Sequence, residues 1–251
     1  MIKRLLPFIK KSSARSLFFL AVIAIGTAIF GLYYGADNYF RIRNIQVHMS
    51  NQWVYESLGN PSLTGISNFE HTSSLFLSTK EAEQTIYDLN PTIKKVTVEK
   101  KLPSELIVTL SFYQPAAVFE VSQGYYVLSM DGRILAKEKT SRKGVPLIKY
   151  YQKLGYDSFN SGDSLSYADL KTSLYFLGKI SDLGFSINNI DINGPDMIAL
   201  YADKKKFVVT TEKESELQAY QLTVLIKQFK IEGKDFKSID LRFEKPIIQV
   251  K

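Results

Sequence analysis

The sequence offers few residues whose chemistry could serve catalysis. There is no cysteine, so thiolate metal sites, cysteine nucleophiles and disulfides are all excluded. The two histidines, His48 and His71, fall in a predicted strand and a predicted loop, and neither belongs to a pair with metal-ligand spacing. The sequence contains no glycine-rich phosphate loop and no Gly-x-Ser-x-Gly elbow. We therefore predict no catalytic residue, no metal site and no cofactor.

Each cluster of like charge has a structural explanation. Glu212, Glu214 and Glu216 fall in the first turns of a predicted helix, where the helix dipole stabilises carboxylates. Residues 204–206, all lysine, fall at a predicted hairpin turn and are typical of a solvated tip. A second basic group could face anionic lipid headgroups, although a solvated sheet face is the simpler interpretation. This group consists of Lys94, Lys95, Lys100 and Lys101.

The net charge of +7 is concentrated at the N-terminus. The first 36 residues hold five basic side chains and no acidic one, which leaves 27 basic against 25 acidic residues in the other 215. A general nucleic-acid-binding surface needs its positive charge on the folded domain, because affinity comes largely from neutralising phosphates. We therefore predict no nucleic-acid partner.

An uncharged, apolar stretch runs from Ser16 to Ala36. As a helix it would be about 31 Å long, which suffices for a hydrocarbon core of roughly 30 Å. It is longer than the apolar region of a signal peptide and has no clear cleavage site. The basic tail, residues 1–15, predicts a cytoplasmic N-terminus. The sequence therefore predicts one transmembrane helix at 16–36, with the rest of the chain outside the cytoplasm.

Beyond this span the pattern predicts an α+β chain of two domains. The first, at 40–113, has the order strand, uncertain helical region, helix, strand, strand. Its first strand is predicted at 40–49, and its clearer helix begins with the capping box Ser78–Glu81 and ends at Asn90–Pro91. The last two strands, 93–100 and 106–112, form a predicted hairpin.

The second domain, at 114–251, is predicted to be mostly antiparallel β structure with two helices. A hairpin over 124–135 turns at Asp131–Gly132, which is a strong hairpin signal. The helices are predicted over 167–183 and 212–231, the second beginning with a capping box at Thr211–Glu214. The remaining strands are predicted at 186–192, 197–201, 206–210, 238–243 and 246–250.

Three segments of the first domain resemble the POTRA module of the bacterial division proteins FtsQ and DivIB, which has the order β-α-α-β-β. They are Phe40-Arg-Ile-Arg-Asn-Ile-Gln-Val47, Asp88-Leu-Asn-Pro-Thr-Ile-Lys-Lys-Val-Thr-Val98 and Leu102-Pro-Ser-Glu-Leu-Ile-Val-Thr-Leu110.

The second domain continues the resemblance through four further segments. They are Phe112-Tyr-Gln-Pro-Ala116, Val145-Pro-Leu-Ile148, Gly162-Asp-Ser-Leu165 and Ile239-Asp-Leu-Arg-Phe243. The chain departs from the family pattern in lacking Glu-Arg before Pro115, in having Ser50 where a glycine often follows the first strand, and in having Phe243 for tyrosine. These departures concern the ends of strands.

The resemblance implies a single-pass protein of the bacterial cytoplasmic membrane, located at the division septum. It implies a non-enzymatic scaffold that binds FtsB and FtsL-type proteins and couples septum assembly to septal peptidoglycan synthase components. An alternative is another POTRA-bearing anchored protein, for secretion or polypeptide handling. By β-augmentation, the partner would bind at Asp240, Leu241, Arg242, Phe243, Pro246, Ile247, Ile248 and Gln249.

Overall fold

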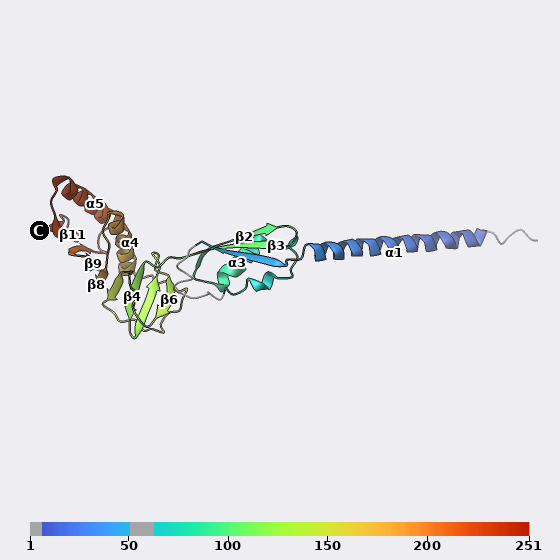
Figure 1. The fold of residues 1–251 in the computed structure, drawn as a ribbon, viewed down its shortest axis with the longest axis horizontal. Coiled ribbons are helices and arrows are strands. Elements are labelled where there is room, and N and C mark those ends of the chain that lie inside the picture. The colour runs from blue at the N-terminus through green and yellow to red at the C-terminus, as the bar shows by residue number, and fades with distance from the viewer. Residues whose placement is uncertain (1–6, 51–62, 251) are drawn as a thin grey trace, which may run out of the picture. The chain divides into compact units, whose positions relative to one another are not determined.

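The computed structural model describes residues 7–50 and 63–250, and only the backbone of residues 7–17 and 20. The described chain divides into two compact units, and each is described here by itself. One holds α1, β1, η1, α3 and most of β2 and β3. The other holds every strand and helix from Ser111 onward. The two units contain separate sheets (Figure 1).

The first element is the long helix α1, Pro7–Tyr39. Its apolar side chains are exposed on all sides, and residues such as Phe19, Ile23 and Phe30 are each at least 60% exposed. Among the residues that the structure describes, no helix has both the length and the apolar character to cross a membrane. The predicted span begins at Ser16, and the side chains of residues 16, 17 and 20 lie outside the described part.

The first unit contains a three-stranded sheet in the order β1-β3-β2. Its strands are β1 (Asn44–Met49), β2 (Ile93–Lys101) and β3 (Glu105–Phe112), and β1 runs parallel to the central β3. Before β2 come the 3-10 turn η1 (Ser67–Phe69) and α3 (Thr79–Leu89), which buries Ala82 and Ile86. Because β1 is parallel to β3, a long connection must return the chain to the same end of the sheet.

Most sequence predictions for this unit agree with its elements, but the first strand, predicted at 40–49, begins only at Asn44. The Ser78 hydroxyl accepts a hydrogen bond from the Glu81 amide at 3.4 Å, in the capping arrangement expected for the start of α3. Asn90 follows the last residue of α3, as predicted. The predicted hairpin is the β2–β3 pair. Most of the uncertain helical region, residues 51–62, lies outside the described residues.

The second unit is built on a nine-stranded sheet in the order β12-β11-β10-β9-β8-β7-β4-β5-β6. Five of its eight pairings are antiparallel, and three are parallel. The strands are β4 (Ala117–Val121), β5 (Gly124–Leu128), β6 (Ile134–Glu138), β7 (Leu147–Tyr150), β8 (Asn189–Ile192), β9 (Ile198–Ala202), β10 (Lys205–Val209), β11 (Phe236–Asp240) and β12 (Ile247–Val250).

Two helices connect parallel strands of this sheet. Helix α4 (Ala168–Asp182) joins β7 to β8, and α5 (Ser215–Glu232) joins β10 to β11. Parallel neighbours require such crossovers, which place both helices against the sheet and each other. The core that they share with the sheet includes Phe119, Phe176, Leu200, Phe207 and Leu222.

Several details of the second domain differ from the sequence predictions, and among them β7 was not predicted as a strand. Strand β4 was not predicted, because Ala117, Val118 and Phe119 are all buried and show no alternation. The predicted strand 186–192 begins only at Asn189. The predicted strand 238–243 instead occupies Phe236–Asp240, so the chain turns at Leu241.

The predicted capping box at Thr211 is wrong. Helix α5 begins at Ser215, with Glu214 as a cap residue that makes no side-chain capping bond. The Thr211 hydroxyl instead donates to the Pro195 carbonyl oxygen at 2.8 Å. A tertiary contact therefore replaces the local cap, and Glu212 and Glu214 precede the helix whose first turn holds Glu216.

Candidate partner-binding site at the terminal strand

The last strand of the chain lies at an open edge of the nine-stranded sheet. β12 pairs antiparallel with β11, in a register that places Asp240 opposite Ile247 and Ile239 opposite Ile248. Within residues 7–50 and 63–250 no second strand pairs with β12. One row of its backbone amides and carbonyls is therefore available to an extended segment of another chain.

β12 itself carries neither a charged side chain nor a proline. Natural edges carry charged residues, internal prolines or covering loops. β12 consists of Ile-Ile-Gln-Val, and Pro246 stands just before it. Ile247 and Val250 are each 57% exposed, whereas Ile248 packs partly against the core. The composition and exposure of β12 favour pairing with a partner.

The turn before β12 is held by an ion pair between Asp240 and Arg242. The Arg242 Nε atom lies 3.0 and 3.2 Å from the two Asp240 carboxylate oxygens, and Nη2 lies 2.8 Å from Oδ2. The Arg242 backbone amide also donates to Asp240 Oδ1 at 3.1 Å. These bonds raise the pKa of the Arg242 guanidinium above its ordinary value. The guanidinium carbon lies 5.4 Å from the centroid of the Phe243 ring, which is 48% exposed.

Lys213, just before α5, holds the same turn from the other side. Its Nζ atom donates to the carbonyl oxygens of Leu241 and Phe243, at 2.9 and 2.7 Å. The Leu241 side chain between these carbonyls is fully buried in the core. Lys213 therefore fixes the backbone, while Leu241 anchors the turn and leaves the Phe243 ring outside.

The structure brings the eight predicted partner-binding residues into one region but gives them different exposures. Leu241 is buried, and Asp240 is occupied by Arg242. Phe243, Ile247 and Gln249 are exposed, while the remaining three residues, Arg242, Pro246 and Ile248, are partly buried. The sequence analysis did not identify Lys213 as part of this site. Its two contacts are with residues 28 and 30 positions further along the chain, and no local pattern signals contacts over that distance.

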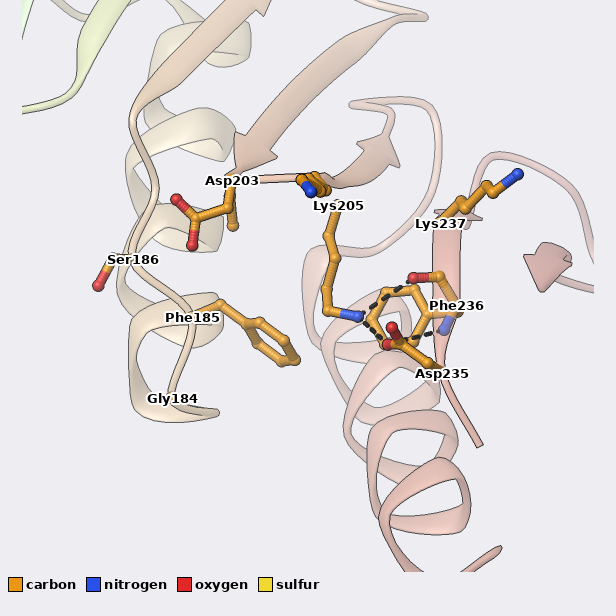
Figure 2. A pocket seen from close by; sticks show the side chains of 10 residues that line it. Gly184, Phe185, Ser186, Asp203, Lys205, Asp235, Phe236 and Lys237 are labelled. Carbon is orange, nitrogen blue, oxygen red and sulfur yellow. Dashed lines mark hydrogen bonds and ion pairs between the residues drawn. The ribbon is translucent and has the colours of Figure 1, made fainter. Parts of the chain in front are cut away.

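A cavity of about 810 Å³ opens where β11 begins, at the opposite end of that strand from the turn. Figure 2 shows the Lys205 ammonium directed at the Asp235 carboxylate and the Phe236 carbonyl oxygen, which lies 3.1 Å from Nζ. The ammonium also lies 4.2 Å from the Phe236 ring centroid. The prediction of a solvated tip is thus wrong for Lys205, although Lys204 is exposed.

The basic group on the β2–β3 hairpin is mainly solvated in this structure. Lys94, Lys95 and Lys101 are exposed, and Lys100 is half-buried. Lys101 Nζ lies 2.8 Å from Glu105 Oε2, and this contact is the main cause that lowers the pKa of the Glu105 carboxyl. Contact with anionic lipid stays a prediction.

No group of three or more possible metal-ligating side chains occurs among the described residues. Burial raises the pKa of the Tyr150 hydroxyl, which also contacts Asp169 Oδ1 at 3.2 Å. Tyr150 is the last residue of β7 and Asp169 lies in the first turn of α4, where its side chain also accepts a bond from the Leu170 amide. This contact therefore has a structural explanation within the core.

Comparison with known proteins finds a family model that matches part of the chain within and around the first unit. Residues 38–111 match the family model of the POTRA domain, FtsQ-type. The match begins near the end of α1 and ends within β3, so it covers the whole three-stranded sheet except the last residue of β3. The search of curated proteins found no match. Over these residues the chain is therefore similar to the POTRA domain of the FtsQ type, which confirms the predicted resemblance to that module.

Proposed function

We propose that this protein is a non-enzymatic scaffold of bacterial cell division, of the FtsQ/DivIB type. The observation that carries the proposal is the match of residues 38–111 to the POTRA domain, FtsQ-type, because FtsQ and DivIB are the division proteins that the sequence resembles. A nine-stranded sheet with an unprotected edge follows it in the chain. Its action is binding, and it links early septal components to septal peptidoglycan synthesis.

The partner site in this proposal is the open edge of β12 together with the turn before it. An extended partner segment adds a tenth strand, and main-chain hydrogen bonds supply affinity. The exposed Phe243 ring and the Arg242 guanidinium, already positioned by Asp240, supply side-chain selectivity. Preorganisation of this kind reduces the entropy cost of binding. The partner is the FtsB subunit of an FtsB–FtsL-type pair.

The proposal includes an anchor in the cytoplasmic membrane through the apolar stretch 16–36. Exposed apolar side chains around α1 support it, because such a helix has no buried face in a protein core. The basic residues before the stretch favour an N-terminus in the cytoplasm. The POTRA domain and the β12 edge would then act outside the cytoplasm.

Capture of an FtsB–FtsL-type pair by the full chain tests the partner site. We expect the double variant Arg242→Glu, Phe243→Ala to lose at least tenfold in affinity, since central aromatic and arginine contacts often contribute 2 kcal/mol or more. Tyr151→Ala is a matched control, because Tyr151 is also 48% exposed but lies next to β7. Equal capture by both variants and the unmodified chain would exclude this site.

A fluorescent fusion tests the division role separately from the partner site. We expect the signal to gather at the septum before constriction. A uniform membrane signal throughout the cell cycle would contradict the division role and favour a POTRA protein for secretion or polypeptide handling. A cytoplasmic signal would contradict the proposed anchor.

A further inference from the structure

Helix α5 carries a second unpartnered surface, on the side opposite its buried face. The helix buries Gln218, Ala219, Leu222 and Ile226 against the sheet and α4. On the other side its apolar residues are exposed by 46% to 81%. We call this row the α5 stripe, and it consists of Leu217, Tyr220, Val224 and Ile231.

The spacing of the α5 stripe is that of a coiled-coil seam. Leu217, Tyr220, Val224 and Ile231 are separated by three, four and seven residues, which places them at successive a and d positions of a heptad. Lys227 occupies the remaining d position. A helix that packs on one sheet needs only one apolar face, so the α5 stripe is not explained by the fold of this unit.

The charges that flank the α5 stripe differ between its two ends. Glu216 and Lys230 both occupy g positions of this heptad register, two heptads apart, near the N-terminal and C-terminal ends of the helix. Both side chains are exposed, and the Lys230 ammonium donates to the Leu183 carbonyl oxygen at 3.2 Å. In an antiparallel pair of helices g positions face g positions, so this flank is complementary to itself.

We propose that the α5 stripe is a self-association surface, at which α5 of a second copy packs antiparallel. In the register that alternates a and d positions, Val224 of each copy packs on Tyr220 of the other. The same register places Glu216 opposite Lys230 of the second copy, twice by symmetry. A partner of one charge sign would match only one end of the stripe.

The size of the α5 stripe limits the strength of this association. Four apolar side chains on one helix of 18 residues cover less than the roughly 1,000 Å² of total buried area expected of a stable complex. The dimer is therefore weak and depends on protein concentration. Its residues lie outside β12 and the turn before it, so variants of the α5 stripe leave the residues of the proposed partner site unchanged.

Cysteine crosslinking of the full chain in detergent micelles tests the proposal, because the natural sequence contains no cysteine. Thr223→Cys places a thiol beside the predicted two-fold axis without altering the α5 stripe. A short bismaleimide is the probe. Lys171→Cys, an exposed position on α4, is the matched control. We expect covalent dimer from Thr223→Cys, increasing with protein concentration, and background dimer from Lys171→Cys.

Charge reversal then tests the antiparallel register. In the Thr223→Cys background, Glu216→Lys should reduce the dimer yield about fivefold, because two ion pairs become two repulsions. Adding Lys230→Glu restores the opposite charges and should restore the yield. Circular dichroism checks that each variant is folded.

Three results would overturn the proposal. One is a yield from Thr223→Cys no greater than that from Lys171→Cys. Another is failure of the double reversal to restore a yield that the single reversal lowers. The third is crosslinking of Thr223→Cys in cells to a different protein in place of a second copy, which would assign the α5 stripe to that protein.

Discussion

The two edge strands of the nine-stranded sheet, β6 and β12, differ in whether other segments bond to their outer backbone groups. At the β6 edge, the loop through Gly162–Leu165 supplies backbone partners: the Ile134 amide donates to the Asp163 carbonyl oxygen at 2.8 Å, and the Gly162 amide donates to the Ile134 carbonyl oxygen at 2.7 Å. At the other edge, no strand of the described chain pairs with the outer side of β12.

The two edge strands also differ in their side chains, which include charged residues on β6 but not on β12. β6 carries Lys137, whose ammonium lies 4.6 Å from the Tyr156 ring centroid, and Glu138, which pairs with Arg142. β12 has no charged side chain. A covered and charged edge ends a sheet, whereas an open and apolar edge invites another strand. The difference teaches that one edge of this sheet is charged and partly covered by a loop, whereas the other is uncharged and accessible to a partner strand.

The largest expected effect is a loss of stability caused by a change at Leu241, in the turn before β12. Leu241→Ala should lower the free energy of unfolding by about 2 to 4 kcal/mol, because a fully buried side chain leaves a cavity. Phe243→Ala, two residues on, should change it by less than about 0.5 kcal/mol. Urea unfolding followed by circular dichroism measures both, and equal losses would refute the different roles of the two residues.

The covered edge should lose stability without losing partner binding. Gly132 has a φ of +81°, and an added Cβ would lie 3.0 Å from the Leu165 carbonyl oxygen. Gly132→Val should therefore cost about 2 kcal/mol of stability, since a β-branched residue is strained in this conformation. Amide hydrogen exchange should increase in β6, while capture of the FtsB–FtsL-type pair stays unchanged. If the folded variant lost capture of the partner pair, partner binding would depend on the β6 edge as well, contrary to this prediction.

The open edge should respond in the opposite way. Ile247→Lys adds to β12 the kind of charge that protects natural edges, at a side chain already 57% exposed. We expect about a tenfold loss of partner affinity, which is about 1.4 kcal/mol, and a stability change within about 0.5 kcal/mol. Isothermal titration calorimetry against the partner pair measures the first value. Unchanged affinity would show that β12 is not the pairing strand.

The smallest effect should come from the contact that holds the turn. Lys213→Met removes both hydrogen bonds to the Leu241 and Phe243 carbonyl oxygens and should cost about 1 kcal/mol of stability. Amide exchange should increase at residues 241–246, with Lys237→Met as an exposed control outside the turn. Unaltered exchange in that segment would show that Leu241 alone positions the turn.

The elements of the first unit were predicted well because each is signalled by residues close together in the sequence. The Ser78 capping box, the alternation in β1 and the apolar runs of β2 and β3 act within a few residues of each other. The helix predicted over 212–231 is confirmed as α5, but its predicted capping box at Thr211 is wrong for the opposite reason. There the Gln218 side chain bonds the Thr210 amide and carbonyl at 3.1 and 2.8 Å, so a nonlocal network sets the start of α5.

At the candidate site too, the sequence predicted the local features but not those that depend on tertiary packing. The sequence identified residues 240–249 as a terminal strand region through their resemblance to a family motif. It could not separate the buried Leu241 from the exposed Phe243, because both are apolar and only the position of the sheet decides which side of the backbone is covered. Nor could it find Lys213, since its contacts cross 28 and 30 residues.

By itself the sequence determined the absence of cysteine chemistry, the charge distribution, the α+β class and the FtsQ-type pattern of the first domain. These follow from residue types and short-range periodicity. Only the tertiary structure decided that β12 is an edge strand and that α5 exposes a second apolar row. Strand order and exposure depend on which distant segments pack together, and no local pattern contains that information.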